Sequence, residues 1–191
     1  MAFPAEPAIH SLTQEIHAAQ TIHQHALAAA QSIFDGVGGG ARVNGEVARK
    51  VVVDLMSSIK RSPEANLLLM QMRRYQEDAF VHSVNVCVLS LVVNAYDAFD
   101  SDGSDTCALG LGALLHDIGE TRIPRNLTRK KDSFSDAERR LLEQHPKLGA
   151  MLLEQSEDVP MLARRIVLEH HERIDGFGYP RRTGGGEDFQ S

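Results

Sequence analysis

The stretch from residue 116 to residue 180 decides how this sequence is interpreted. It opens with His116-Asp117-Ile118-Gly119, continues to His145, and closes with the run HHERIDGFGYP at residues 170–180. Imidazoles and carboxylates are common metal ligands, and chance rarely groups a His-Asp pair, a spaced His and a His-His pair. The pattern therefore predicts a site that holds more than one metal ion.

The composition limits the class of protein that can carry such a site. A chain of 191 residues with 42% hydrophobic content can bury the core of one domain with a small helical extension. The formal net charge of -6 argues against a broad basic face for nucleic acid polymers, but it is compatible with a small anionic substrate held by metal ions. With no uninterrupted apolar run of ~18 residues and no leader-like N-terminus, we expect no membrane span and a cytoplasmic location. Cys87 and Cys107 are predicted to be buried free thiols.

The N-terminal part is predicted to be one helix followed by a linker. Residues 5–34 carry apolar side chains at roughly helical spacing, and the glycines between residues 36 and 40 end that helix. We therefore predict a helical extension and linker at residues 1–43 and a second, larger domain at residues 44–191. The four histidines of the N-terminal helix fall on different faces, which favours a solvated helix over a second metal site. They are His10, His17, His23 and His25.

The larger domain is also predicted to be helical. Apolar spacing and cap signals indicate helices at residues 44–62, 64–74, 77–99, 107–118, 147–155 and 159–171, with another that leads to His145. Asn44 is a candidate cap, Val47 begins the first apolar face, and Ser135 and Glu138 have the spacing of a capping box. No strand pair or internal repeat is evident, so the predicted fold class is all-α.

The ligand types indicate which metal ions would bind. A site with histidines and an aspartate but no cysteine favours Fe or Mn over a structural zinc ion. The carboxylate of Asp117 can bridge two cations. His170 and His171 point about 100° apart on a helix, so they would reach different ions or different positions of one cluster. His82 and Asp78 lie one helical turn apart and could supply a nitrogen and an oxygen to the same cluster.

These motifs resemble those of the HD-GYP family, a branch of the HD superfamily of metal-dependent phosphohydrolases. They stand in the family's order: HSVNV at residues 82–86, LLHDIG at 114–119, QHPKLG at 144–149 and HHERIDGFGYP at 170–180. The resemblance implies a five-helix HD core with extra helices and a centre of two or three divalent ions, Fe or Mn. It also implies hydrolysis of the bacterial second messenger cyclic di-GMP to pGpG and/or GMP.

The resemblance assigns roles to individual residues as well. His116 and Asp117 would be catalytic, and the implied metal ligands are His82, His116, Asp117, His145, His170 and His171, with Asp78 where trinuclear members place an extra carboxylate. Gly178, Tyr179 and Pro180 would lie beside the substrate groove, in a loop that is proposed in this family to contact GGDEF domains. The resemblance leaves a homodimer open.

Two departures from the family pattern leave alternatives open. Glu120 stands where members commonly have a lysine near a substrate phosphate, and it would repel an anionic substrate unless Arg122, Arg125 or Lys130 compensates. The chain also ends soon after the GYP loop, without the helix in which members carry a further ligating aspartate, so we expect a C-terminally truncated member. Three functions are therefore weighed: a cyclic di-GMP phosphodiesterase, a regulatory module that binds without turnover, and an HD phosphohydrolase acting on another nucleotide.

Overall fold

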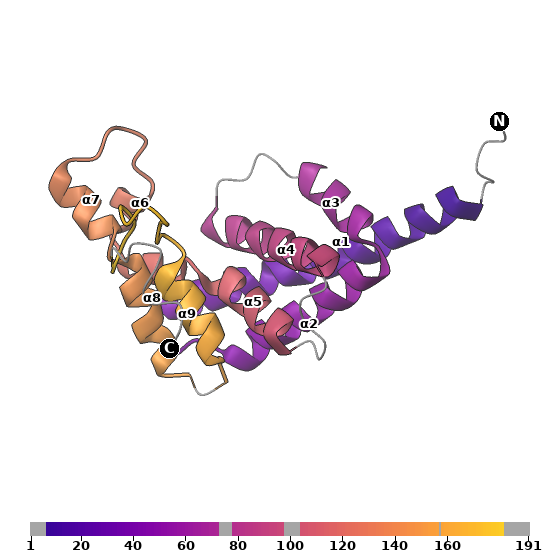
Figure 1. The fold of residues 1–191 in the computed structure, drawn as a ribbon, viewed down its shortest axis with the longest axis horizontal. Coiled ribbons are helices and arrows are strands. Elements are labelled where there is room, and N and C mark those ends of the chain that lie inside the picture. The colour runs from indigo at the N-terminus through magenta and orange to yellow at the C-terminus, as the bar shows by residue number, and fades with distance from the viewer. Residues whose placement is uncertain (1–6, 73–77, 98–103, 157, 182–191) are drawn as a thin grey trace.

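The computed structural model describes residues 7–72, 78–97, 104–156 and 158–181, which form helices joined by turns and loops (Figure 1). The first half contains α1 (Pro7–Gly38), α2 (Gly45–Arg61), α3 (Pro63–Met72), α4 (Ala79–Asp97) and α5 (Ser104–Leu115). The second half contains the 3-10 helix η1 (Ile118–Arg122), then α6 (Arg125–Thr128), α7 (Asp136–Leu142), α8 (His145–Glu154) and α9 (Met161–Glu169). The described residues include no strand, so the predicted all-α class is confirmed.

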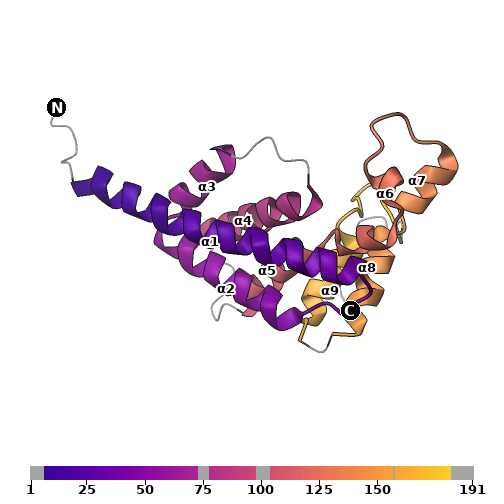
Figure 2. The same ribbon diagram turned by 180° about the vertical axis from the view of Figure 1, so that it is seen from behind.

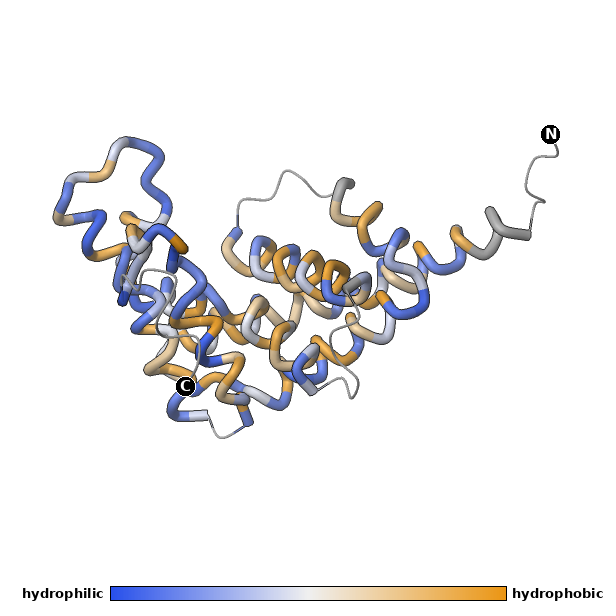
Figure 3. The backbone as a smooth tube through the Cα atoms, viewed as in Figure 1, coloured by the Kyte–Doolittle hydropathy of each residue, from blue (hydrophilic) through white to orange (hydrophobic). Residues whose placement is uncertain are grey.

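One hydrophobic core joins the two halves. Leu55 of α2, Leu91 of α4, Leu114 of α5 and Leu153 of α8 are fully buried in the same cluster. The long helix α1 runs along the back of the molecule and contributes to this cluster from residues 26 to 37, including Ile33 (Figure 2). The hydropathy pattern agrees, because apolar segments meet where α2, α4 and α5 pack, while the chain around α7 is mostly hydrophilic (Figure 3).

Two glycines let neighbouring helices approach α5 closely. A Cβ atom at Gly110 would lie 2.6 Å from Cγ1 of Val52 on α2, and one at Gly112 would lie 2.7 Å from Cβ of Ile166 on α9. Both contacts are tighter than a real side chain allows, so α2 and α9 pack against the bare backbone of α5. This packing places the C-terminal end of α5 beside α9.

The predicted helix caps are present. Asn44 accepts a hydrogen bond from the backbone N–H of Val47 at 3.0 Å, and Ser135 and Glu138 form the complete capping box at the start of α7. The apolar face of α2 begins at Ala48 and not at Val47, which is 38% exposed.

The interpretation of the N-terminal histidines was wrong for one of them. His17 and His25 are exposed, but His23 is 2% exposed, and its Nε2 lies 3.1 Å from Oδ1 of the buried Asn66 on α3. This contact satisfies a polar group inside the core and packs α3 against α1. The side chain of His10 lies outside the described residues.

One described helix resembles a membrane span in length and composition. The window Ala79–Tyr96 of α4 is long and apolar enough to cross a membrane, although polar residues interrupt its apolar run. A core helix passes the same test, and α4 packs against α5, α1, α2 and α3. The finding is therefore only a weak indication of a membrane span.

Both cysteines, Cys87 and Cys107, are free and buried, as predicted.

Candidate metal centre

The ends of three helices deliver most of the candidate ligands. His116 directly follows α5, His145 stands three residues beyond the end of α7 and begins α8, and His170 directly follows α9. The helices α5, α8 and α9 pack against one another or against η1, so these three ends meet at one place. His82 comes from α4.

The same hydrogen bond orients each of these three histidines. The Nδ1 atoms of His116, His145 and His170 lie 2.8, 2.8 and 2.9 Å from the carbonyl oxygens of Ala113, Leu142 and Val167, each three residues earlier in the chain. A carbonyl oxygen can only accept, so Nδ1 carries the hydrogen and donates it. In the neutral imidazole, Nε2 therefore presents its lone pair to the site, which is the arrangement that metal-ligating histidines commonly use.

Asp117 lies between two sets of histidines, and its two oxygens face different sets. Oδ2 lies 2.9 Å from Nε2 of His116, whereas Oδ1 lies 3.4 Å from Nε2 of His145 and 3.5 Å from Nε2 of His170. One carboxylate is thus shared between the two sides of the site. This is the geometry expected of a carboxylate that bridges two cations.

The candidate ligands form two groups that share Asp117. One ligand atom from each of Asp117, His145, His170 and His171 lies within 4.8 Å of the others, and so does one from each of His82, His116 and Asp117. Asp78 belongs to neither group.

Burial and charge set the protonation of the site. Burial lowers the pKa of His116 and of His145, but the hydrogen bond and charge of Asp117 outweigh burial and raise both above the ordinary value. Burial would raise the pKa of Asp117, but hydrogen bonds from His116, His145 and His170 hold it far below the usual range. Burial, reinforced by the charges of His170 and His145, lowers the pKa of His171 to about 4. Asp117 is thus ionised and His171 neutral near pH 7, as ligation requires.

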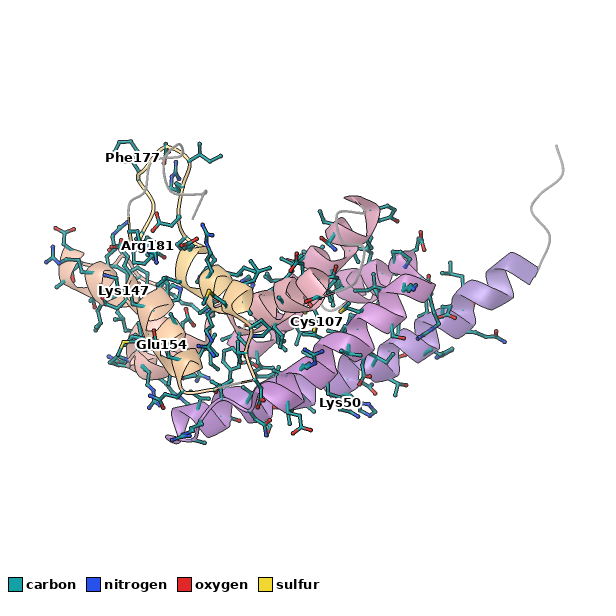
Figure 4. All side chains as sticks on the ribbon, turned by 60° about the horizontal axis from the view of Figure 1, so that its bottom comes forward. Lys50, Cys107, Lys147, Glu154, Phe177 and Arg181 are labelled. Carbon is teal, nitrogen blue, oxygen red and sulfur yellow. The ribbon has the colours of Figure 1, made fainter. Side chains whose placement is uncertain are left out.

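The loop after α9 folds back onto His171. The Tyr179 ring stacks on the imidazole of His171 with centroids 4.5 Å apart, and the backbone N–H of Tyr179 donates to the His171 carbonyl at 3.2 Å. Gly178 permits this fold, because a Cβ atom there would lie 2.6 Å from Cα of Glu172. Ile174 and Phe177 are 89% and 84% exposed, and Phe177 lies at the outer tip of the loop (Figure 4).

A cavity of about 600 Å³ lies beside Asp117. His82, Asp78 and Glu120 line it on the side of the metal ligands, and Arg125 and Arg129 line it from α6 and the residue that follows. Burial and the negative charge of Asp117 raise the pKa of Glu120.

Comparisons with known proteins show the family of this chain. The profile of a family described as "HD domain" matches residues 64–187. The chain is 34% identical over 176 residues to the cyclic di-GMP phosphodiesterase PA4108 of Pseudomonas aeruginosa, covering 91% of this chain and 42% of that protein.

The chain belongs to the HD-domain family.

The chain is also similar to one further curated protein and to one solved structure. The 3'3'-cGAMP-specific phosphodiesterase 3 of Vibrio cholerae is 32% identical over 106 residues, which is 56% of this chain and 22% of that protein. The structure of Bd1817, an HDG"Y"P protein from Bdellovibrio bacteriovorus, superposes with a TM-score of 0.71 at 26% identity and covers 86% of this chain and 53% of that one. The resemblance to HD-GYP proteins is thereby confirmed. The chain spans 42% of the length of PA4108.

The structure brings together most, but not all, of the site residues predicted from the sequence. It brings the six expected ligands together, whereas Asp78 lines only the neighbouring cavity. Gly178, Tyr179 and Pro180 lie in the loop next to His171 and not in the cavity lining.

The two predicted phosphate-binding cations do not line the cavity either. Arg122 is exposed outside it, and Nζ of Lys130 lies 2.7 and 2.8 Å from the carboxylate oxygens of Glu138. Arg125, considered as an alternative, does line the cavity, and so does Arg129. Neither arginine forms an ion pair with a described residue.

Sequence reasoning missed one wall of the cavity altogether. Gln31, Phe34 and Asp35 of α1 line it together with Phe80 of α4. Three of these residues precede the matched HD region, and no motif marks them. Their position follows only from how α1 packs across the domain.

Proposed function

We propose that this chain is a metal-dependent phosphodiesterase that hydrolyses cyclic di-GMP to pGpG and/or GMP. The observation that carries the proposal is the position of Asp117, whose two oxygens face different histidine sets. The cyclic dinucleotide phosphodiesterases to which the chain is similar support the substrate class.

The donor set fits divalent metal ions. It offers imidazole nitrogens and a carboxylate without sulfur, which suits Fe or Mn. His145 and His170 bring their Nε2 atoms within 3.1 Å, although both rings already donate their Nδ1–H groups to carbonyls. Without a metal ion this contact requires a proton on one of the two rings, which the raised pKa of His145 favours, and a divalent ion would take the place of that proton. We propose two or three ions, held by His82, His116, Asp117, His145, His170 and His171, with Asp78 as a further ligand.

The protein's own residues bind and position the substrate. Bound divalent ions would supply Lewis-acid polarisation of the phosphate and an activated water. Arg125 and Arg129 offer guanidinium groups for a phosphate near Asp117, in place of the lysine that Glu120 replaces. Arg122 and Lys130, which lie outside the cavity lining, are further candidates for binding a substrate phosphate. Gly178, Tyr179 and Pro180 form the GYP loop, which would hold His171 in place and border the substrate.

A regulatory module without turnover is the second candidate, and Glu120 favours it. This carboxylate lines the cavity beside Asp117 and adds negative charge where an anionic substrate must enter. Such a module would bind the nucleotide or a partner and leave the phosphodiester intact.

The GYP loop is proposed to bind a GGDEF-domain protein. The support is the exposure of two apolar side chains of this loop, Ile174 and Phe177, of which Phe177 lies at the outer tip. Phe177→Ala should weaken binding in a titration with a GGDEF domain, whereas Met161→Ala, at an exposed position on α9, should not. Equal affinity of both variants would contradict the proposal. We also propose a cytoplasmic location and a homodimer.

The deciding experiment is turnover of cyclic di-GMP by the chain loaded anaerobically with Fe(II) or Mn(II). We expect pGpG or GMP to form and expect Asp117→Ala to abolish it. Folded, metal-loaded protein that binds cyclic di-GMP without cleaving it would refute the enzyme and support the regulatory module. Cleavage of another cyclic dinucleotide alone would assign a different substrate.

A further inference from the structure

The cavity beside Asp117 has a second wall that takes no part in the metal centre. Gln31, Phe34 and Asp35 lie in the last two turns of α1, and Phe80 lies at the start of α4. At about 600 Å³, the cavity falls within the ~300–1,000 Å³ typical of small-molecule sites. One space is therefore bounded by metal ligands, by two arginines, and by this wall.

The wall combines an aromatic surface with a hydrogen-bond acceptor. Phe34 is buried and Phe80 is half-buried, so both rings are held in place by packing, while the Asp35 side chain is exposed. Proteins that hold a single base commonly pack it against aromatic or apolar side chains and read its Watson–Crick edge with hydrogen bonds. Both kinds of group are present here.

The carboxylate of Asp35 selects between purines by its chemistry. An ionised carboxylate accepts hydrogen bonds and donates none. Guanine presents two neighbouring donors, N1–H and the N2 amino group, which match its two oxygens. Adenine presents the acceptor N1 beside its amino group, so one carboxylate oxygen would face a lone pair. Asp35 is thus suited to guanine.

The local position of Asp35 is unfavourable for the helix. It stands in the last turn of α1, where the carbonyl ends of the helix concentrate negative charge, and a carboxylate there is destabilising. Among the described residues, no side chain or backbone group forms a hydrogen bond or ion pair with its carboxylate. A residue that destabilises its own helix and forms no stabilising contact in return is expected at functional sites.

We propose that Asp35, supported by Phe34 and Phe80, recognises a guanine base of the substrate. The inference rests on the proposed function, because it places the nucleotide phosphate between the metal centre and Arg125 and Arg129, with the base toward α1. It adds that base specificity comes from a helix outside the matched HD region.

Calorimetric titration of the Mn(II)-loaded full chain with GMP and with AMP tests the proposal. Wild-type protein should bind GMP about tenfold more tightly than AMP, the discrimination typical of one good bidentate contact to a base. Asp35→Asn should remove that preference by weakening GMP, without lowering the melting temperature. Asp54→Asn, at an exposed position of α2 outside the cavity, is the matched control and should retain the preference.

Three outcomes would overturn the assignment. Wild-type protein could bind GMP and AMP equally, Asp35→Asn could weaken both nucleotides to the same extent, or it could reduce the bound manganese, which would make Asp35 a metal ligand. Failure of the proposed function looks different, because a GMP preference that depends on Asp35 would persist without any cleavage of cyclic di-GMP.

Discussion

Gly119 of η1 lies directly against the backbone of His145. A Cβ atom at Gly119 would overlap the carbonyl oxygen of His145 and would lie 2.6 Å from the backbone nitrogen of Gly149. The motif that carries Asp117 is thereby packed onto the first turn of α8, which carries His145. The glycine sets the separation of two candidate ligands that lie 28 positions apart in the sequence.

Gly119→Ala is expected to separate these ligands. The added methyl group must displace α8, since backbone atoms cannot move aside as a flexible side chain can. We expect a loss of about 1–3 kcal/mol in the free energy of unfolding, measured by urea denaturation, together with less bound metal by elemental analysis.

Gly36→Ala provides a control of the opposite sign. Gly36 lies within the helix α1, and a Cβ atom there would meet only Cβ of Ala41, at 3.9 Å. Replacing a helical glycine by alanine should stabilise the protein by about 0.5–1 kcal/mol. Unchanged stability and metal content in Gly119→Ala would show that α8 tolerates the displacement.

Metal binding should stabilise the chain through His145 and His170. At a free metal concentration of about 100 times the dissociation constant, binding adds about 2.7 kcal/mol, which corresponds to a rise of roughly 5–10 °C in melting temperature for a chain of this size. His170→Ala should lose most of that rise. In EDTA the variant should lower the melting temperature much less than in Mn(II), because it then loses only the contacts of the His170 ring with Val167, His145 and Asp117.

Exposed His25 on α1 supplies the comparison. His25→Ala should retain the full metal-dependent rise in melting temperature. If His170→Ala lowered the melting temperature as much in EDTA as in Mn(II), His170 would be a packing residue and not a ligand.

Sequence patterns were sufficient to predict most of the helices and the six side chains that meet at the candidate metal centre, for two different physical reasons. Periodic apolar residues and caps such as Asn44 act locally, so α2 begins where the pattern predicted. The candidate ligands were recognisable because their residue types and order are unusual. The common hydrogen bond from Nδ1 to a carbonyl three residues earlier was not predicted, although the placement of His116 at a helix exit already pointed toward it.

What remained hidden depends on packing between distant segments. His23 is polar by type, and only the position of Asn66 on α3 makes its burial favourable. Asp35 carries no motif, and it reaches the cavity because α1 packs into the same core as the HD region. Lys130 looked free for a phosphate, but Glu138 of the capping box is its neighbour.

The stack of Tyr179 on His171 should support metal binding through its ring and not through its hydroxyl group. Tyr179→Phe keeps the ring and should bind Mn(II) as the wild type does. Tyr179→Ala should bind it more weakly by a factor of roughly 2–12, because an aromatic pair contributes about 0.5–1.5 kcal/mol. Competition with a coloured chelator measures both affinities. Equal loss in the two variants would assign the effect to the hydroxyl group.

Glu120 should make the metal-free protein less stable as the pH rises. Its pKa is raised in the folded state by burial and by the charge of Asp117, so the folded protein holds this proton more tightly than the unfolded chain does. Below the unfolded pKa both states are protonated and no destabilisation arises. As the pH rises through the folded pKa, the ionised carboxylate must be accommodated beside Asp117.

Glu120→Gln removes this dependence and isolates its sign. In EDTA, the melting temperature of the variant should match that of the wild type near pH 4 and exceed it by a few degrees at pH 7. A constant difference at both pH values would mean that shape, and not charge, distinguishes the two side chains. With Mn(II) bound, the lost repulsion should lower KM for cyclic di-GMP in Glu120→Gln and lower it further in Glu120→Lys. Added salt should shrink both effects, because screening weakens interactions between partly exposed charges.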